Sequence, residues 1–351
     1  MTSPVTRRAR RWLAAAALVT SAACGGSGGA GSQSVQINGA GATFPYPIYS
    51  KWFSEYNTLR PDVRINYQSI GSGGGIRQMQ NRTVFFGATD GPMTTEQIAG
   101  APGPILHLPT VVGSVVPAYN LSGVAAELKF TGPILAGIFL GDISKWNDPA
   151  IAAVNPGVAL PDRTITVVHR SDGSGTTYVW VDYLAKVSPA WQQKVGVGTS
   201  VNWPVGLGGK GNEGVAGLVK LTDGAIGYVE PVYATQNQIP FGAVQNAAGQ
   251  FVRSSIQSVT AAADGAAPTM PDDFRVSITN APGAASYPIA SFTWLLFYQN
   301  PQDKAQAATM VEFMQWALTD GQAFTADLGY SPLPASVVEK ELRALERIQV
   351  Q

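Results

Sequence analysis

The sequence has few of the side chains on which thiol, disulfide or zinc chemistry depends. Its 351 residues include one cysteine and two histidines. One cysteine cannot form a disulfide within the chain, and three such ligands leave little with which to build a zinc site, so no metal is expected. Charged residues make up only 13% of the chain, with 23 basic and 23 acidic residues. Because nucleic-acid-binding proteins carry a basic excess, nucleic acid is not an expected partner.

Apolar side chains and glycine are abundant instead. Hydrophobic residues make up 45% of the chain, which is enough for a buried core and excludes wholesale disorder. A chain of this length suits one large domain or two medium ones. The 39 glycines and 24 prolines predict many turns and many places where the backbone approaches another group closely. Beyond the N-terminal region, no apolar run reaches the length of ~18 residues that a membrane-spanning helix needs.

The N-terminus has the features of an export signal. Four arginines between positions 7 and 11 precede an apolar run at 12–19 and small residues up to 23, which is typical of a signal peptide over residues 1–23. Cys24 follows the stretch TSAA, which resembles a lipobox without its usual leucine. This predicts cleavage before Cys24 and acylation of that residue, against the alternative of an ordinary signal with an incidental cysteine. Residues 24–34 then form a lipidated cysteine with a flexible Gly/Ser tether. The protein is expected in the cell envelope, in the periplasm or on the outer face of the cytoplasmic membrane.

Strand-like and helix-like segments alternate from residue 35 onward, which predicts an α/β fold with largely parallel sheets. Apolar runs predict strands at 34–38, 63–68, 84–88, 111–119, 164–169, 225–229 and 289–298. Apolar periodicity predicts helices at 45–56, 76–82 and 304–318, and another that follows residue 169 and ends near 186. The stretch 261–272 has the composition of an exposed loop.

One pattern occurs three times: a strand, then a turn rich in Gly, Ser and Thr, then a helix. The turns lie at 39–45, 71–75 and 172–177. A helix N-terminus presents unpaired backbone N–H groups and the positive end of the helix dipole. Glycine lets a ligand approach these donors, and the hydroxyls add donors of their own, so the pattern predicts an uncharged anion site. The alternative is that each turn only caps its helix.

Known phosphate-binding and catalytic motifs do not fit these turns. The nearest P-loop candidate, at 208–211, has Gly211 where Ser or Thr is required. A dinucleotide fingerprint fails at Ile76, where a glycine is needed. A nucleophile elbow around Ser174 fails at Asp172, which takes the place of its first glycine.

Two charged residues follow strands beside these turns. Arg170 ends the strand at 164–169 and offers the paired donors that match an oxyanion. Asp90 follows the strand at 84–88, and an ionised carboxylate only accepts hydrogen bonds. Asp90 therefore fits an anion that keeps a proton, as phosphate does near neutral pH and sulfate does not. The alternative for Asp90 is a turn residue before Gly91 and Pro92.

The residues at this point resemble a known family, the phosphate-binding proteins of the bacterial high-affinity phosphate ABC importer. The resemblance covers nearly all of 35–342 and is carried by six blocks: GAGATFPYPIYSKW (39–52), GSGGGIRQM (71–79), FGATD (86–90), HRSDGSGTTYV (169–179), WPVGLGGKGNEGV (203–215) and GAIGYVE (224–230). It implies a two-lobed periplasmic-binding-protein fold of type II-like topology, with a hinge and a ligand cleft between the lobes. Lobe one would comprise 35–118 and 290–351, and lobe two 121–288. The chain would cross between them near 119–120 and 286–291.

The resemblance also implies a set of site residues. The phosphate-binding residues it implies are Thr43, Phe44 through its backbone N–H, Ser72, Asp90 as the proton-accepting carboxylate, Arg170, Ser174, Gly175 and Thr176. Asp172 would orient Arg170 through an ion pair.

The implied function is reversible binding of inorganic phosphate and its delivery to the membrane permease of an ABC importer and the ATPase that drives it. No catalytic residue, cofactor or metal is implied, and a monomer is expected. A receptor for another protonated tetrahedral oxyanion such as arsenate, and a phosphate-ester hydrolase that uses Ser174 or Thr176, stay open as alternatives. A surface adhesion protein would leave the three turns unexplained. Removal of residues 1–23 takes away four arginines and no acid, which leaves 19 basic and 23 acidic residues and a net charge of −4. Anion binding would then depend on local donors, because long-range attraction is absent.

Overall fold

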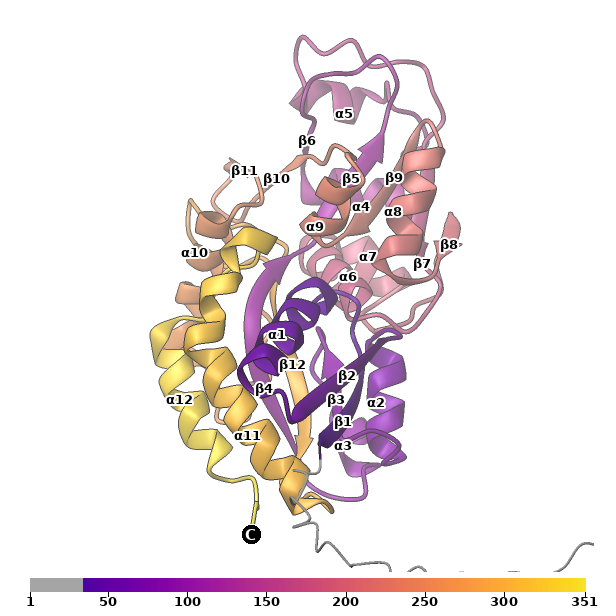
Figure 1. Cartoon of the computed structure of the whole chain (residues 1–351). Coiled ribbons are helices and arrows are strands. Elements are labelled where there is room, and N and C mark those ends of the chain that lie inside the picture. Colours follow the sequence, from indigo (N-terminus) through magenta and orange to yellow (C-terminus); the bar gives the residue numbers. More distant parts are fainter. Residues whose placement is uncertain (1–33) are drawn as a thin grey trace, which may run out of the picture. The chain divides into compact units, whose positions relative to one another are not determined.

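The computed structural model describes residues 34–351, along which strands and helices alternate (Figure 1). The predicted signal peptide, Cys24 and all but the last residue of the tether lie outside the described residues and stay predictions. No helix within residues 34–351 combines the length and the apolar character needed to cross a membrane.

Five strands form the first sheet, in the order β2-β1-β3-β12-β4. Their bounds are Val35–Gly41 (β1), Val63–Ser69 (β2), Phe86–Thr89 (β3), Ile105–Ser114 (β4) and Ala290–Tyr298 (β12). β1 runs parallel to β2 and β3, and β12 runs antiparallel to β3 and β4. Because β1, β2 and β3 are parallel, the turns that follow them leave from the same edge of the sheet.

Four strands form the second sheet, in the order β5-β9-β7-β8. Their bounds are Val116–Asn120 (β5), Thr166–Arg170 (β7), Leu207–Gly209 (β8) and Ala225–Val229 (β9). β7 runs parallel to β8 and β9, whereas β5 is antiparallel to β9. The ends of β7, β8 and β9 therefore also share one edge. A third, small sheet consists of Lys129–Phe130 (β6), Ala243–Gln245 (β10) and Phe251–Val252 (β11).

Helices surround the sheets (Figure 1). Their bounds are Tyr46–Leu59 (α1), Ser72–Gln80 (α2), Thr95–Ala99 (α3), Gly132–Leu140 (α4), Pro149–Val154 (α5), Gly175–Val187 (α6), Pro189–Lys194 (α7), Gly211–Leu221 (α8), Pro231–Gln236 (α9), Ile256–Ala266 (α10), Lys304–Leu318 (α11) and Ala335–Leu345 (α12), with 3-10 turns at Ala267–Thr269, Asp320–Phe324 and Ala326–Leu328. The expected strand at 225–229 and the expected helix at 304–318 agree with the bounds of β9 and α11.

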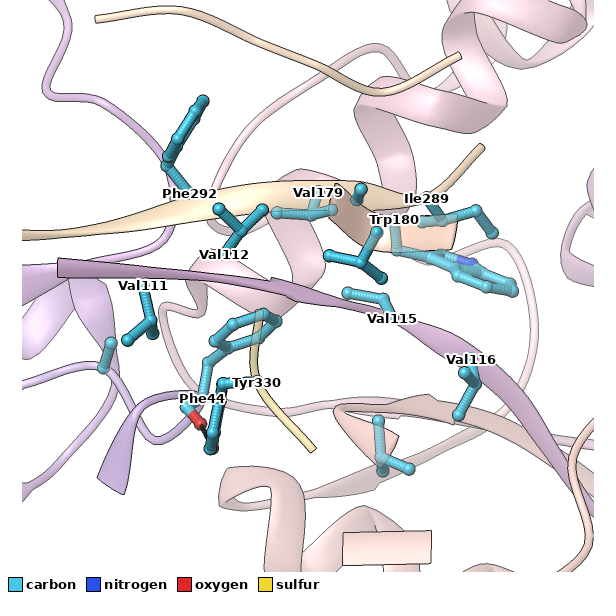
Figure 2. Packing of buried hydrophobic residues seen from close by; sticks show 14 of the residues in the cluster. Phe44, Val111, Val112, Val115, Val116, Val179, Trp180, Ile289, Phe292 and Tyr330 are labelled. Carbon is cyan, nitrogen blue, oxygen red and sulfur yellow. Dashed lines mark hydrogen bonds between the residues drawn. The ribbon is translucent and has the colours of Figure 1, made fainter. Parts of the chain in front are cut away.

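One buried hydrophobic cluster extends over both large sheets. Figure 2 shows its part around β4 and β12, where the rings of Phe44 and Tyr330 lie side by side on one side of β4. Their centroids are 6.3 Å apart, and the Tyr330 hydroxyl donates to the Phe44 carbonyl at 2.7 Å. This packing fixes the turn that follows β1 against the core.

The chain changes sheets earlier than the sequence predicts. The apolar run at 111–119 was expected to be one strand, but it divides at Val115 into β4 of the first sheet and β5 of the second. Residues 116–118, expected in lobe one, therefore belong to the second sheet. The reason is pairing: Val116 to Asn120 are in register with β9, which no local pattern in the run could indicate.

The expected loop at 261–272 is also wrong, because α10 occupies its first half. This segment is mostly helical, and α10 packs against β4 and β12 of the first sheet. Every residue of β4 and β12 is buried, so both faces of these strands need a covering layer. The alanine-rich sequence, which resembles a loop in composition, supplies a helix face small enough to lie close to the strands, with Val259, Ala262 and Ala263 buried.

Ala263 tests this correction. Ala263→Glu would place an unpaired carboxylate between α10 and the first sheet, and we expect it to lower the free energy of unfolding by about 3 kcal/mol or more. Asp264 is exposed on the same helix, so Asp264→Glu is the matched control and should change stability by less than ~0.5 kcal/mol. Equal, small effects in denaturant unfolding would contradict the packing of α10.

Candidate functional site

The turn after β1 has its carbonyl groups tied to the rest of the protein. The Tyr233 hydroxyl donates to the Thr43 carbonyl at 2.5 Å, and Tyr330 donates to the Phe44 carbonyl. Thr43 and Phe44 are buried. Within residues 34–351 neither the Thr43 N–H nor the Phe44 N–H has an acceptor. The turn thus offers two backbone donors and the Thr43 hydroxyl.

The turn after β2 connects the two large sheets. Gly71 has a φ of 84°, and Ser72 is the first residue of α2. The Ser72 hydroxyl oxygen accepts from Asp90 N at 3.3 Å and from Gly175 N at 3.0 Å. Asp90 follows β3 of the first sheet, while Gly175 begins α6, which follows β7 of the second sheet. A backbone bond from Gly73 N to Gly173 O at 2.9 Å runs beside it.

Arg170 ends β7 and is held by Asp172. Its Nε donates to Asp172 Oδ1 at 2.8 Å and its Nη2 to Asp172 Oδ2 at 2.6 Å. Burial alone would raise the pKa of Asp172, but the hydrogen bonds and charge of Arg170 outweigh it and hold that pKa below its ordinary value. The remaining nitrogen, Nη1, donates to the Thr176 hydroxyl oxygen at 3.3 Å. The carboxylate therefore orients the guanidinium.

The third turn caps α6 and meets the turn after β2. Ser174 is the N-cap of α6, and its Oγ accepts from Thr177 N at 3.0 Å. The Gly175 N–H is taken by Ser72. A Cβ on Gly175 would lie 2.5 Å from both Asp90 Oδ2 and Ser72 Oγ, so only glycine allows this approach.

Asp90 is the acceptor of the cluster. It is 1% exposed, and its Oδ1 accepts from the Thr293 hydroxyl at 2.8 Å. Its Oδ2 is buried and has no partner within the described residues. Burial raises the pKa of Asp90 to about 7, although the Thr293 hydrogen bond, the Arg170 charge and the nearby Ser72 hydroxyl lower it in part. Glu230 is fully buried as well, and burial raises its pKa well above the ordinary value.

The structure adds Asn212, which the sequence analysis missed. Asn212 lies in the first turn of α8 and is fully buried. Its Nδ2 donates to the Thr43 hydroxyl oxygen at 2.9 Å and to that of Thr176 at 3.1 Å. A signal was present: the Gly-rich stretch at 208–211, set aside because it is not a P-loop, is a fourth turn before a helix. Thr293, in the interior of β12, gave no such signal.

Neither histidine hydrogen-bonds a side chain of this cluster among residues 34–351, although His169 Nδ1 lies 3.0 Å from the Arg170 carbonyl oxygen. The His107 Nε2 accepts from Met93 N at 3.1 Å, and burial lowers the pKa of His107 to about 3. His169 stacks on Trp203 with centroids 4.8 Å apart. Residues 34–351 contain no group of three His, Cys, Asp or Glu residues placed to bind a metal ion.

These contacts therefore join residues from both sheets into one buried cluster. Thr43, Phe44, Ser72 and Asp90 come from the first sheet, and Arg170 and Thr176 from the second. The cluster holds hydroxyl and backbone donors, one oriented guanidinium and one unpartnered carboxylate oxygen. Such a set can bind a small anion that brings a proton of its own.

This chain is similar to known proteins in sequence and in fold. A family model described as a PBP superfamily domain matches residues 28–321. The phosphate-binding protein PstS of Xylella fastidiosa (strain 9a5c) is 48% identical over 310 residues, which are 88% of this chain and 84% of that protein. The protein of the same name from Pasteurella multocida (strain Pm70) is 47% identical over 310 residues, which are 88% of this chain and 89% of that protein. The crystal structure of a phosphate-binding protein from Stenotrophomonas maltophilia matches with a TM-score of 0.67 at 19% identity, over 88% of this chain and 93% of that one. This structural match shows a shared fold.

Asp90 predicts a pH dependence of stability in the protein without ligand. Folding raises the pKa of its carboxyl from 3.8 to about 7, so between these values the folded protein holds a proton that the unfolded chain has lost. The free energy of unfolding should therefore fall as the pH rises from ~4 to ~7, by on the order of a few kcal/mol, with little further change from this group above that range.

Asp90→Asn should remove this contribution and be more stable than the wild type at a pH of ~8 in denaturant unfolding. Asp264→Asn, at an exposed position, is the control and should leave the slope unchanged. The same slope in wild type and Asp90→Asn would mean that water reaches this carboxyl.

Proposed function

Because this chain belongs to the PBP superfamily and, within it, to the family of phosphate-binding proteins PstS, we propose that it binds inorganic phosphate outside the cytoplasmic membrane and delivers it to an ABC importer. The observation that carries the proposal is the buried, unpartnered Oδ2 of Asp90 among hydrogen-bond donors. An anion without a proton would leave this acceptor facing another acceptor. Monohydrogen phosphate meets it with a P–OH group.

In this proposal the ligand meets a set of donors and one acceptor. The Thr43, Ser72 and Thr176 hydroxyls, the Phe44 N–H and Arg170 Nη1 donate to phosphate oxygens, and Asp90 accepts from the P–OH. Gly175 allows the close approach of α6 to Asp90, and its N–H supports Ser72. The Ser174 Oγ accepts the cap bond, which leaves its O–H for the ligand. Many neutral donors and a single guanidinium suit a protein whose predicted mature charge is −4.

We propose binding without chemistry at this site. Neither histidine contacts Ser174 or Thr176 among residues 34–351, so a hydrolase would have no histidine base beside its hydroxyl. We therefore propose a reversible receptor, monomeric and without a cofactor, held at the envelope by the lipid on Cys24. Closure of its two lobes on the anion would mark the loaded form for the permease and its ATPase.

Asp90 should decide between phosphate and sulfate. Wild-type protein should bind phosphate tightly in isothermal titration calorimetry, and a large excess of sulfate should not displace it. Asp90→Asn offers an amide donor where the carboxylate repels a deprotonated oxygen, so the preference for phosphate should fall by a factor of about 100 or more. Ser174→Ala should change this preference less. Similar affinities of the wild type for both anions, or the opposite ranking of the variants, would contradict the role of Asp90. Arsenate, which is tetrahedral and protonated, should compete with phosphate.

Gly175→Ala tests whether the two sheets must approach as closely as they do here. The added methyl would meet Asp90 Oδ2 and Ser72 Oγ at 2.5 Å, so phosphate affinity should fall by a factor of about 100 or more. The matched control is Gly217→Ala in α8, where a Cβ meets no atom within 4 Å, and which should bind phosphate as the wild type does. Unchanged affinity in Gly175→Ala would show that binding does not need this contact.

A further inference from the structure

We propose that Asn212 sets the hydrogen-bond polarity of the site: it occupies lone pairs of the Thr43 and Thr176 hydroxyls, so that both O–H groups can only donate to the ligand. This inference deepens the proposed function and rests on it. Asn212 is a positioning residue, because it acts through the two hydroxyls and needs no contact with phosphate.

The Thr43 hydroxyl receives two donors, both from Asn212. Asn212 Nδ2 lies 2.9 Å and Asn212 N lies 3.4 Å from Thr43 Oγ1. A hydroxyl has one hydrogen and two lone pairs. With both lone pairs occupied, Thr43 Oγ1 cannot accept from a ligand, and its hydrogen is left to donate.

The Thr176 hydroxyl receives two donors from different residues. Asn212 Nδ2 lies 3.1 Å and Arg170 Nη1 lies 3.3 Å from Thr176 Oγ1. Its lone pairs are therefore also occupied, and within residues 34–351 neither threonine hydroxyl donates to another group. One amide nitrogen thus gives two hydroxyls the same polarity.

The backbone fixes which end of the Asn212 amide faces the threonines. Glu230 N lies 3.4 Å from Asn212 Oδ1 and donates to it, so the oxygen is held on the Glu230 side and the NH₂ group on the other. The α8 turn that carries Asn212 is itself held by the bond from Gly211 N to Asp172 Oδ1 at 3.0 Å. The amide is buried and cannot exchange these partners for water.

The consequence is selectivity for an anion. A hydroxyl with a free lone pair would accept from a neutral or cationic ligand as readily as it donates to an anion. Because the Thr43 and Thr176 hydroxyls can only donate, the proton of the ligand is accepted by Asp90 Oδ2. Thr43 follows β1 of the first sheet, and Thr176 lies on α6, which follows β7 of the second sheet. The two hydrogen bonds of the Asn212 amide therefore form only when these two sheets lie close together.

A double-mutant cycle tests the proposal by phosphate titration calorimetry. Asn212→Ala should weaken phosphate binding by a factor of about 30 or more in the wild-type background. In a Thr43→Val/Thr176→Val background, where there are no hydroxyls to orient, the same substitution should change the affinity by less than a factor of about three. A loss of equal size in both backgrounds would overturn the proposal, because a merely structural role of Asn212 does not depend on the hydroxyls.

Controls separate this outcome from misfolding and from failure of the proposed function. Asn155 is a buried asparagine that bonds Lys129 and Ile151 instead. Asn155→Ala should lower stability and leave phosphate affinity unchanged. If Asn212→Ala does not fold, Asn212→Asp, which keeps the shape, goes through the same cycle, and its loss of affinity should shrink in the valine background. If wild-type protein does not bind phosphate, the proposed function fails; if it binds and the cycle is additive, only the role of Asn212 fails.

Discussion

A carboxylate oxygen buried among hydrogen-bond donors is the constraint on which the rest of this structure depends. Asp90 Oδ2 has no partner within the described residues, and burial raises the pKa of its carboxyl to about 7. A buried acceptor without a hydrogen bond is destabilising. A ligand that brings a proton can donate this hydrogen bond, whereas a fully deprotonated anion cannot. The same oxygen that weakens the empty protein can therefore make the filled site selective.

The fold supplies this arrangement by ending parallel strands at common edges. β1, β2 and β3 lead into the turns of Thr43, Ser72 and Asp90, while β7, β8 and β9 lead to Arg170, to the α8 turn and to Glu230. Glycine then lets the two edges come together, since the Gly73–Gly173 backbone bond and the Gly175 N–H bond to Ser72 leave no space for side chains. Local donors, and not net charge, make up the site.

The sequence predicted the features that local patterns encode. Glycine and hydroxyl residues before a helix mark Thr43, Ser72 and Thr176, and the Arg170–Asp172 pair lies within one turn. What it missed depends on partners far along the chain. Asn212 matters through its contact with Thr43, 169 residues away, Thr293 bonds Asp90 across 203 residues, and the division of 111–119 into two strands depends on pairing with β9. The role of α10 was missed because buried small residues and loop residues have the same composition.

Neutron diffraction from deuterium-exchanged crystals of the phosphate complex would locate the protons on which this selectivity depends. We expect a deuterium between one phosphate oxygen and Asp90 Oδ2, with the Thr43 and Thr176 hydroxyl deuteriums directed at other phosphate oxygens. Phosphate bound with no deuterium between it and Asp90, or with either threonine deuterium directed away from the ligand, would contradict this expectation.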